Sequence, residues 1–308
     1  MSLVEFEGRS VIVTGGGGGL GREYALALAR HGARVMVNDL GGDVHGGGAA
    51  SSMADQVVDE IRAAGGDAAA CYDTVATSVG GRAIVDATMD AFGRVDALIH
   101  NAGILRDKTL HNLTEEDIDA VFDVHLKGGF NVAVPAFARM KEAGYGRIVM
   151  TSSSSGLLGN FGQANYGAAK TGLVGLVHVA AIEGARHGIL ANAISPGART
   201  RMTEGLLGEL ADLLDPAQVA AMAVYLASPQ CTQTHEIYSA GGGRFARYAI
   251  GLNRGWFRTS DVATADDVLQ NIDAIRDLDT LQVFGDGMGE LQILQEMARE
   301  AGALPDAR

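Results

Sequence analysis

Short apolar runs alternate along the chain with longer segments in which apolar residues recur at helical spacing. The apolar runs predict strands at residues 10–14, 34–39, 67–72, 95–100, 147–151, 189–194 and 236–239. The helical spacing predicts helices at residues 21–31, 52–64, 80–92, 115–143, 166–187 and 216–227. Apolar strands that alternate with helices favour a parallel sheet covered by helices on both sides. The pattern therefore predicts an α/β protein with a doubly wound parallel sheet.

Two segments interrupt this alternation. A glycine-rich loop follows the second predicted strand at residues 41–51, and a tail follows the last predicted strand. The last fifty residues hold eleven acidic side chains against three arginines and are expected to be mostly helical. Neither segment has the apolar content of an independent domain. We expect one catalytic domain at residues 1–250 with a C-terminal extension at residues 251–308.

The chain is strongly acidic, with 24 lysines and arginines against 37 aspartates and glutamates and a net charge of −13. Such a surface repels the phosphates of nucleic acids and of anionic lipids, which argues against both as partners. The most apolar stretch, residues 173–182, is interrupted by His178 and is too short to span a membrane. The first nine residues lack the pattern of a signal peptide, so a soluble cytoplasmic protein is expected.

A run of glycines joins the first predicted strand to the first predicted helix. Thr14 is followed by five consecutive glycines, Gly15 to Gly19, and then by Leu20 and Gly21. Glycine is needed where a backbone turns tightly and approaches a pyrophosphate, and the following helix offers its free N–H groups. Five consecutive glycines leave more than one register of the fingerprint open. The position predicts a Rossmann-type dinucleotide site.

The second predicted strand ends on Asp39. A carboxylate at this position can accept hydrogen bonds from the hydroxyls of the adenine ribose, and it repels a 2′-phosphate. NAD is therefore expected as the cofactor in preference to NADP. The alternative is that Asp39 only caps the turn that follows it. No metal site is expected.

Three residues have the types and spacing of a proton-transfer site. Tyr166 and Lys170 are four residues apart on a predicted helix and so share one face. An ammonium group beside a phenol should lower the pKa of the phenol toward the range in which it exchanges protons. Ser153 follows the fifth predicted strand, whose carboxyl end should face the ligand crevice, and its hydroxyl can hold a substrate oxygen beside Tyr166.

These residues, in this order, resemble the short-chain dehydrogenase/reductase family over residues 6–243. The resemblance also rests on Asn101-Ala102-Gly103 and on Ser195-Pro196-Gly197. It implies that Tyr166 is the acid–base residue, that Ser153 positions the substrate carbonyl, and that Lys170 binds the nicotinamide ribose and tunes Tyr166. It further implies that a set of residues lines the cofactor crevice together with Tyr166 and Lys170: Gly15, Gly19, Leu20, Gly21, Asp39, Asp73, Asn101, Ala102, Gly103, Pro196 and Gly197.

Two histidines depart from the family pattern. His100 stands where many members have Asn before Asn-Ala-Gly, and His125 stands where most have a helix Asn that joins a proton relay. A relay that uses the backbone carbonyl would tolerate His125, and a buried packing role is favoured over a titrating one.

His125 is shared with a narrower group that the sequence resembles. This group is the (3R)-hydroxyacyl-CoA dehydrogenase part of peroxisomal multifunctional enzymes and their bacterial relatives. The similar stretches are residues 37–43, 101–107, 150–153, 159–166 and 201–203.

The resemblance implies an NAD-dependent oxidoreductase that interconverts a (3R)-hydroxyacyl-CoA and a 3-oxoacyl-CoA. A hydroxysteroid dehydrogenase of the 17β type, or an enzyme that acts on a steroid side-chain CoA thioester, stays open because a wide apolar cleft suits either substrate. A catalytically silent dinucleotide-binding regulator is a third alternative, although such a protein would need none of Ser153, Tyr166 and Lys170. Substrate identity rests on analogy with the group.

The sequence also offers candidates for substrate contacts. The apolar wall of the cleft would be built by Leu157, Leu158, Phe161, Leu206 and Leu207. Basic residues that could meet CoA phosphates are Arg106, Lys108, Arg199, Arg201 and Arg244, although a surface or structural role is favoured for each. The family resemblance implies a homodimer or homotetramer supported by the helix that carries Tyr166.

Overall fold

The computed structural model describes residues 3–42, 45, 47, 52–198, 212–259 and 262–305. The chain divides into two compact units, Met1–Arg247 and Tyr248–Arg308. The first unit contains the sheet and the candidate site, and the second contains three helices among its described residues.

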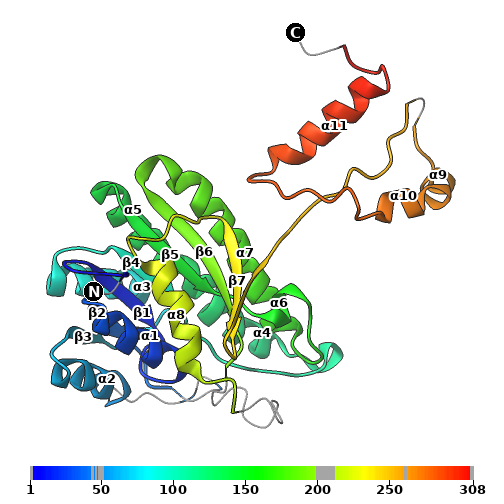
Figure 1. The fold of residues 1–308 in the computed structure, drawn as a ribbon. Coiled ribbons are helices and arrows are strands. Elements are labelled where there is room, and N and C mark those ends of the chain that lie inside the picture. The colour runs from blue at the N-terminus through cyan, green and yellow to red at the C-terminus, as the bar shows by residue number, and fades with distance from the viewer. Residues whose placement is uncertain are drawn as a thin grey trace. The chain divides into compact units, whose positions relative to one another are not determined.

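The described strands form one sheet in the order β3-β2-β1-β4-β5-β6-β7-β8 (Figure 1). Their bounds are β1 Ser10–Thr14, β2 Arg34–Asn38, β3 Asp67–Cys71, β4 Ala97–His100, β5 Gly146–Thr151, β6 Ile189–Pro196, β7 Glu236–Gly241 and β8 Arg244–Tyr248. Neighbours from β3 to β7 pair in parallel, which confirms the predicted doubly wound sheet. The apolar pattern did not predict β8, because this strand is exposed or only partly buried along its length.

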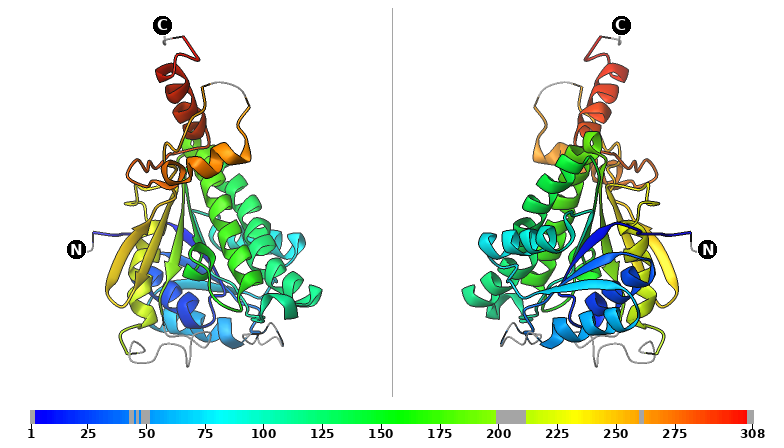
Figure 2. Two further views of the ribbon diagram at one scale, coloured as in Figure 1. Left: turned by 90° about the vertical axis from the view of Figure 1, so that its right-hand side faces the viewer. Right: turned by 90° about the vertical axis from the view of Figure 1, so that its left-hand side faces the viewer.

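Helices cover both faces of the sheet (Figures 1 and 2). One face is covered by α1 (Gly19–Arg30), α2 (Ser52–Ala63) and α8 (Pro216–Ala227). The other is covered by α3 (Ser78–Phe92), α5 (Gly128–Ala143) and α7 (Ala164–Gly184). Aliphatic side chains such as Val11, Leu28 and Ile61 are buried between the first group and the strands. Each side chain of this kind contributes about 1.5–3 kcal/mol when water is removed from it.

The helix predicted at residues 115–143 is interrupted in the structure. α4 (Glu115–Phe122) is followed by a π-helical turn, η2 (Asp123–Lys127), and only then by α5. Apolar residues continue at helical spacing across this turn, so the pattern alone predicted one unbroken helix. Single π turns inside helices are frequent at functional sites, and this one carries His125.

Strand register brings residues far apart in sequence to one edge of the sheet. Thr14 at the end of β1 pairs with Asn38 of β2 on one side and with His100 of β4 on the other. His100 in turn pairs with Met150 of β5. Because the strands are parallel, their carboxyl ends meet at this edge, where ligands bind in open α/β sheets.

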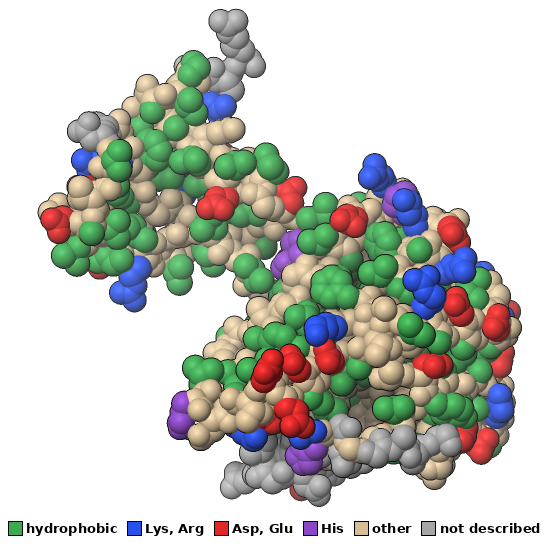
Figure 3. Space-filling view, turned by 180° about the vertical axis from the view of Figure 1, so that it is seen from behind, with side chains coloured by type: hydrophobic (Ala, Val, Ile, Leu, Met, Phe, Trp, Pro, Cys, Tyr) green, Lys and Arg blue, Asp and Glu red, His purple; other side chains and the backbone are tan. Residues whose placement is uncertain are grey.

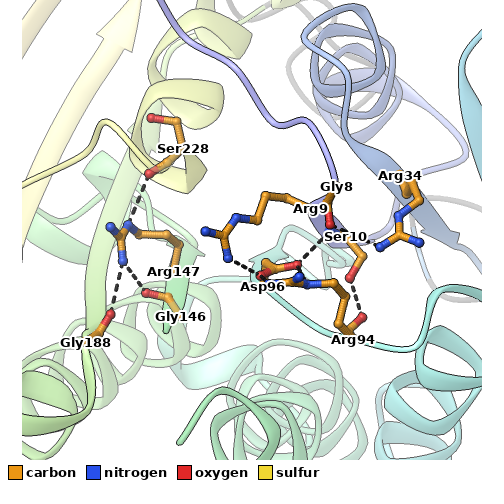
Figure 4. Close-up of polar contacts among 10 residues, drawn as sticks. All are labelled: Gly8, Arg9, Ser10, Arg34, Arg94, Asp96, Gly146, Arg147, Gly188 and Ser228. Carbon is orange, nitrogen blue, oxygen red and sulfur yellow. Dashed lines mark hydrogen bonds and ion pairs between the residues drawn. The ribbon is translucent and has the colours of Figure 1, made fainter. Parts of the chain in front are cut away.

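An ion cluster ties the amino ends of the strands together at the opposite edge (Figure 4). Asp96, just before β4, is buried and accepts hydrogen bonds from Arg9 Nη1 at 2.8 Å, from Arg94 Nε at 2.6 Å and from the Ser10 amide at 2.9 Å. Arg147 of β5 donates to four main-chain carbonyls, those of Gly146, Gly188, Ser228 and Cys231. These contacts hold the sheet together at a distance from the candidate site.

The second unit contains α9 (Ala265–Gln270), α10 (Ile272–Arg276) and α11 (Met288–Glu300). Thr264 and Asp267 form a reciprocal cap at the start of α9, and Arg254 pairs with Glu300 at 2.5 Å. Leu252 and Gln282 form an isolated antiparallel bridge. In the part of the chain that the structure describes, no helix is both long and apolar enough to cross a membrane.

Candidate active site

The glycine loop lies between β1 and α1 and approaches its neighbours closely. Gly15 and Gly19 have positive φ angles of 63° and 50°, which glycine adopts without strain. A Cβ atom at Gly21 would lie 1.9 Å from the Gly15 carbonyl oxygen. α1 begins without a side-chain cap and without an acidic residue in its first turn. Its first N–H groups therefore suit a phosphate, so the loop fits the pyrophosphate of a dinucleotide.

Asp39 follows β2 and faces the glycine loop. Its Oδ2 accepts the N–H of Gly17 at 2.8 Å, and its Oδ1 accepts the N–H of Gly41 at 2.7 Å. The residue therefore does cap the turn after the strand, as the alternative interpretation has it, and it also holds the loop. Each carboxylate oxygen has a further lone pair, so these contacts leave room for ribose hydroxyls.

The structure brings Ser153, Tyr166 and Lys170 together beside the carboxyl end of β5. Ser153 caps the short helix α6 (Ser154–Leu157), and its hydroxyl also hydrogen-bonds the phenol of Tyr166 in the first turn of α7. Lys170 lies one turn later, with Nζ 5.5 Å from the centroid of the Tyr166 ring. The same Nζ donates to the main-chain carbonyl of Thr151 at 2.6 Å.

The expectation that Lys170 lowers the pKa of Tyr166 is wrong for this structure. Burial raises the pKa of Tyr166 to about 12; the hydrogen bond with Ser153 lowers it, and the carboxylate of Asp107 raises it. Burial also lowers the pKa of Lys170 to about 7. Lys170 is itself desolvated and directs its Nζ to the Thr151 carbonyl, so it does not offset the desolvation of the phenol.

His125 packs against Tyr166 from the π turn. The two rings meet edge to face, with centroids 5.2 Å apart and planes at 88°. His125 Nε2 lies 3.0 Å from the amide nitrogen and 2.8 Å from the carbonyl oxygen of Ile104. Burial, with the charge of Lys170 second, lowers the pKa of His125 well below its usual range. A neutral, packed imidazole is favoured over a titrating one.

Asn101, Ala102 and Gly103 connect the glycine loop to the π turn. The amides of Asn101 and Ala102 donate to Thr14 Oγ1 at 3.1 and 3.2 Å, and Asn101 Nδ2 donates to the Gly15 carbonyl at 3.2 Å. A Cβ atom at Gly103 would lie 2.3 Å from Cε1 of His125, so only glycine fits beside that ring.

The remaining predicted cofactor residues lie at the same edge of the sheet. Asp73 follows β3, and its carbonyl accepts a hydrogen bond from Asn38 Nδ2 at 2.9 Å. Pro196 ends β6, and the Gly197 amide donates to the Ala240 carbonyl at 2.8 Å. Among the described residues, no cluster of three or more His, Cys, Asp or Glu side chains is placed to hold a metal ion.

Sequence reasoning missed a pair of residues beside Tyr166. Gln163, three residues before Tyr166, donates from Nε2 to Oδ2 of Asp107 at 2.6 Å, and Asp107 is an exposed carboxylate. Asn165 Nδ2 adds a hydrogen bond to the Arg106 carbonyl at 3.1 Å. These contacts join the segment after Gly103 to the start of α7. Asp107 and Gln163 each lay inside a stretch that resembles the narrower group, but only the fold shows that they meet and that the charge of Asp107 reaches the phenol.

The predicted substrate contacts are only partly covered by the structure. Four of them lie outside the described residues: Arg199, Arg201, Leu206 and Leu207. Leu158 and Phe161 are 75% and 88% exposed, as side chains at the mouth of a site would be. Lys108 pairs with Asp117 at 2.6 Å at the start of α4, which favours a structural role over a contact to CoA.

The model of the short chain dehydrogenase family matches residues 9–209. This chain belongs to the short-chain dehydrogenase family. It is therefore an oxidoreductase of a family that uses nicotinamide dinucleotides.

Three relatives show where in the family this dehydrogenase falls. A short-chain type dehydrogenase/reductase of Mycobacterium tuberculosis is 52% identical over 248 residues, covering 80% of this chain and 87% of that protein. The peroxisomal multifunctional enzyme type 2 of Drosophila melanogaster is 45% identical over 313 residues, covering 99% of this chain and 52% of that protein. The hydroxyacyl-CoA dehydrogenase ChsB1 of Mycobacterium tuberculosis is 40% identical over 252 residues, covering 76% of this chain and 77% of that protein.

The solved structure of the full-length Drosophila enzyme matches this dehydrogenase with a TM-score of 0.82 at 38% identity. The match covers 96% of this chain and 50% of the other. The dehydrogenase thus spans about half the length of that multifunctional enzyme, and the match includes most of the second unit.

Proposed function

We propose that this dehydrogenase uses NAD to interconvert a (3R)-hydroxyacyl-CoA and a 3-oxoacyl-CoA. The observation that carries the reaction type is the grouping of Ser153, Tyr166 and Lys170 beside the glycine loop at the carboxyl edge of the sheet. The substrate class is supported by the relatives, which include an enzyme named as a hydroxyacyl-CoA dehydrogenase. The intact trio argues against a silent dinucleotide-binding regulator, which would need none of the three residues.

The protein residues would divide the work as follows. In the oxidative direction Tyr166 accepts the hydroxyl proton of the substrate, and Ser153 hydrogen-bonds the same oxygen. Lys170 would bind the nicotinamide ribose in addition to the Thr151 carbonyl that it contacts. The cofactor, when bound, supplies the hydride acceptor. The crevice for it would be lined by the glycine loop, Asp39, Asp73, Asn101–Gly103, Pro196 and Gly197.

NAD rather than NADP is supported by the position of Asp39. Its carboxylate accepts the Gly17 amide of the glycine loop through Oδ2, and it would meet the adenine ribose beside that loop. A 2′-phosphate there would bring a second negative charge to within a few ångströms of the first, which costs affinity.

A homo-oligomer is supported by the outer face of α5 and α7. Phe130 and Val134 of α5 and Val179 and Ile182 of α7 are all more than 40% exposed. Figure 3 shows the side of the first unit that carries these helices. Exposed apolar side chains gathered on neighbouring helices are typical of an interaction site. A cytoplasmic location stays a prediction from the sequence, since several relatives are named as peroxisomal.

A substrate panel tests the proposal. The full chain is assayed for NAD reduction with (3R)- and (3S)-hydroxyacyl-CoA and with a free steroid alcohol, and NADH and NADPH binding are compared by fluorescence titration. We expect the highest kcat/KM with the (3R) thioester and tighter binding of NADH. Tyr166→Phe should lower kcat about 10²-fold or more while the affinity for NADH is kept.

Four results would argue against the proposal. A much larger kcat/KM for the steroid, or a preference for the (3S) thioester, would favour the steroid alternative or another acyl substrate. Because apolar contacts discriminate by only about 1–3 kcal/mol per methylene, some overlap between acyl and steroid substrates is expected. Equal affinity for NADH and NADPH would contradict the role of Asp39, and full activity of Tyr166→Phe would remove the catalytic assignment.

A further inference from the structure

His100 is a buried histidine to which the proposed proton and hydride transfers assign no direct part. It ends β4, beside the end of β1, and is 1% exposed. Its Nδ1 lies 3.0 Å from Thr14 Oγ1, and its Nε2 lies 3.2 Å from the main-chain carbonyl oxygen of His125. The imidazole therefore spans from the strand that leads into the glycine loop to the π turn that packs on Tyr166.

The neighbours of His100 determine where its proton lies. Thr14 Oγ1 accepts two N–H groups, those of Asn101 and Ala102, which occupy both of its lone pairs. The Thr14 hydroxyl proton must then be donated to Nδ1 of His100. In a neutral imidazole the ring proton is consequently on Nε2, where it is donated to the carbonyl of His125. The Thr14 hydroxyl and both ring nitrogens of His100 therefore all have hydrogen-bond partners.

The same chain of contacts continues to the catalytic tyrosine. The carbonyl that His100 binds belongs to the residue whose ring meets Tyr166 edge to face and whose Nε2 contacts Ile104. Gly129 of α5 packs beside the His100 ring: a Cβ atom there would make an ordinary contact with its Cδ2 at 3.6 Å but would lie 2.6 Å from Cδ2 of Leu173. His100 thus helps to fix the position of the π turn through the carbonyl of His125. The His125 ring in turn limits where the Tyr166 ring can lie.

We propose that His100 is a positioning residue for this reaction: through Nδ1 it is fixed by Thr14, and through Nε2–H it holds the carbonyl of His125 and so the π turn against Tyr166. This role extends the proposed function, because it concerns the same site. An Asn at this position, as many family members have, can match the contact to Thr14. Its side chain is too short to reach the carbonyl of His125 as well.

The surroundings of His100 keep it in the neutral form that this role needs. Burial lowers its pKa to about 4, the charge of Lys170 on α7 acts in the same direction, and the carbonyl of His125 acts against them. The groups that face it from β1 and from the π turn are Thr14 and His125, neither of which carries a negative charge. A protonated ring would also present a second N–H to Thr14, whose lone pairs are already used.

Two near-isosteric variants separate the two contacts. His100→Gln can place its amide N–H near the position of Nε2 and keep the contact to His125, whereas His100→Asn can keep only the contact to Thr14. We expect His100→Asn to lower kcat about tenfold, the effect of losing one buried hydrogen bond, with the affinity for NADH within twofold of wild type. His100→Gln should recover kcat to within about threefold. His178→Gln, at a histidine stacked on His235 away from the trio, measures the general cost of such a change.

The tautomer of His100 can be measured by NMR, which gives a test that does not depend on activity. Long-range ¹H–¹⁵N spectra of the histidine-labelled protein, with the His100 signal assigned from the Gln variant, should show the Nε2–H tautomer without titration between pH 5.5 and 9. The opposite tautomer, or a titration near neutral pH, would overturn the proposal even if the enzyme acts on hydroxyacyl-CoA. Equal losses of kcat in both variants that follow their melting temperatures would reduce His100 to a structural residue. If the tautomer is as expected but the wild-type chain oxidises no hydroxyacyl-CoA, the proposed function fails instead.

Discussion

Tyr166 and Lys170 are both buried, and burial moves their pKa values apart, because it raises that of the phenol and lowers that of the ammonium group. The phenol has a pKa of about 12 and the ammonium one of about 7, so near neutral pH the phenol is protonated and the amine titrates. A protonated phenol is ready to donate to a ketone, whereas the oxidative direction needs the phenolate. The fraction of phenolate increases with pH, so the rate of alcohol oxidation should increase with pH.

A substitution of Asp107 tests directly whether a nearby charge affects the pKa of Tyr166. Its carboxylate raises the pKa of Tyr166, because a negative charge disfavours the phenolate. Asp107→Asn should therefore lower that pKa, so the rise of kcat for alcohol oxidation with pH should begin at lower pH. The amide oxygen can still accept the hydrogen bond from Gln163, so the loop should keep its place. The measurement is the pH profile of kcat between pH 7 and 10.5.

Asp107→Glu is the matched control, since it keeps the charge and should keep the profile. If the profile of Asp107→Asn stays where it is, or moves to higher pH, the carboxylate does not act on Tyr166 as the structure indicates.

Among the elements of the site, the π turn could not be predicted from the spacing of apolar residues. The strands and most helices were predicted because their apolar residues follow the spacing of a buried face, and the trio could be found from spacing within one helix and one strand end. The pairing of Thr14 with His100 joins residues 86 positions apart, and it exists only because β1 and β4 are neighbours in register. The direction of the Lys170 amine, likewise, depends on the Thr151 carbonyl of a strand. Sequence spacing carries no information on either contact.

His125 in the π turn allows a test of the packing interpretation. The imidazole is neutral, and its ring contacts are with Ile104, Gly103 and the edge of Tyr166. His125→Asn should keep most of the activity and the wild-type pH profile, because no titrating group is removed. It should lower the free energy of unfolding by about 1–3 kcal/mol, since a smaller side chain leaves space beside Tyr166.

His125→Gln provides the control, as it can keep the contact to Ile104 and should recover part of that stability. An almost complete loss of kcat in His125→Asn with unchanged NADH binding would show that the imidazole takes part in the chemistry.

At the opposite edge of the sheet, the Asp96 cluster should affect stability without affecting the reaction. Asp96→Asn removes a buried charge that two arginines share, while the amide can still accept from the Ser10 N–H. Breaking a buried pair costs about 3–5 kcal/mol, but Arg9 and Arg94 are partly exposed and water screens them, so we expect about 2 kcal/mol. Denaturant unfolding measures this value, and kcat should change less than twofold. A large fall in kcat in the folded variant would contradict the separation of the two edges.

Considered as a whole molecule, the chain concentrates its buried apolar side chains in the first unit. Among the described residues of the second unit, Ile293 and Ala298 are the buried hydrophobic side chains, whereas Leu269, Met288 and Leu294 are at least half exposed. A unit of this size needs a larger core, a disulfide or a metal to fold alone, and neither cysteine lies in it. The expectation that the extension is not an independent domain therefore stays a prediction with a physical basis.

Two truncated chains test that prediction. Residues 1–250 retain β8 and every residue of the candidate site, so this fragment should fold cooperatively and bind NADH with an affinity within about threefold of the full chain. Residues 251–308 expressed alone should show little helix by circular dichroism and no cooperative thermal transition, because the apolar area that they bury cannot offset the entropy of ordering the chain. Fluorescence titration and thermal unfolding of both fragments, beside the full chain, provide the comparison. A cooperative transition in the isolated extension would make it a domain in its own right. An unfolded 1–250 fragment would mean that the catalytic unit needs the extension to be stable, and the boundary proposed from the sequence would then be wrong.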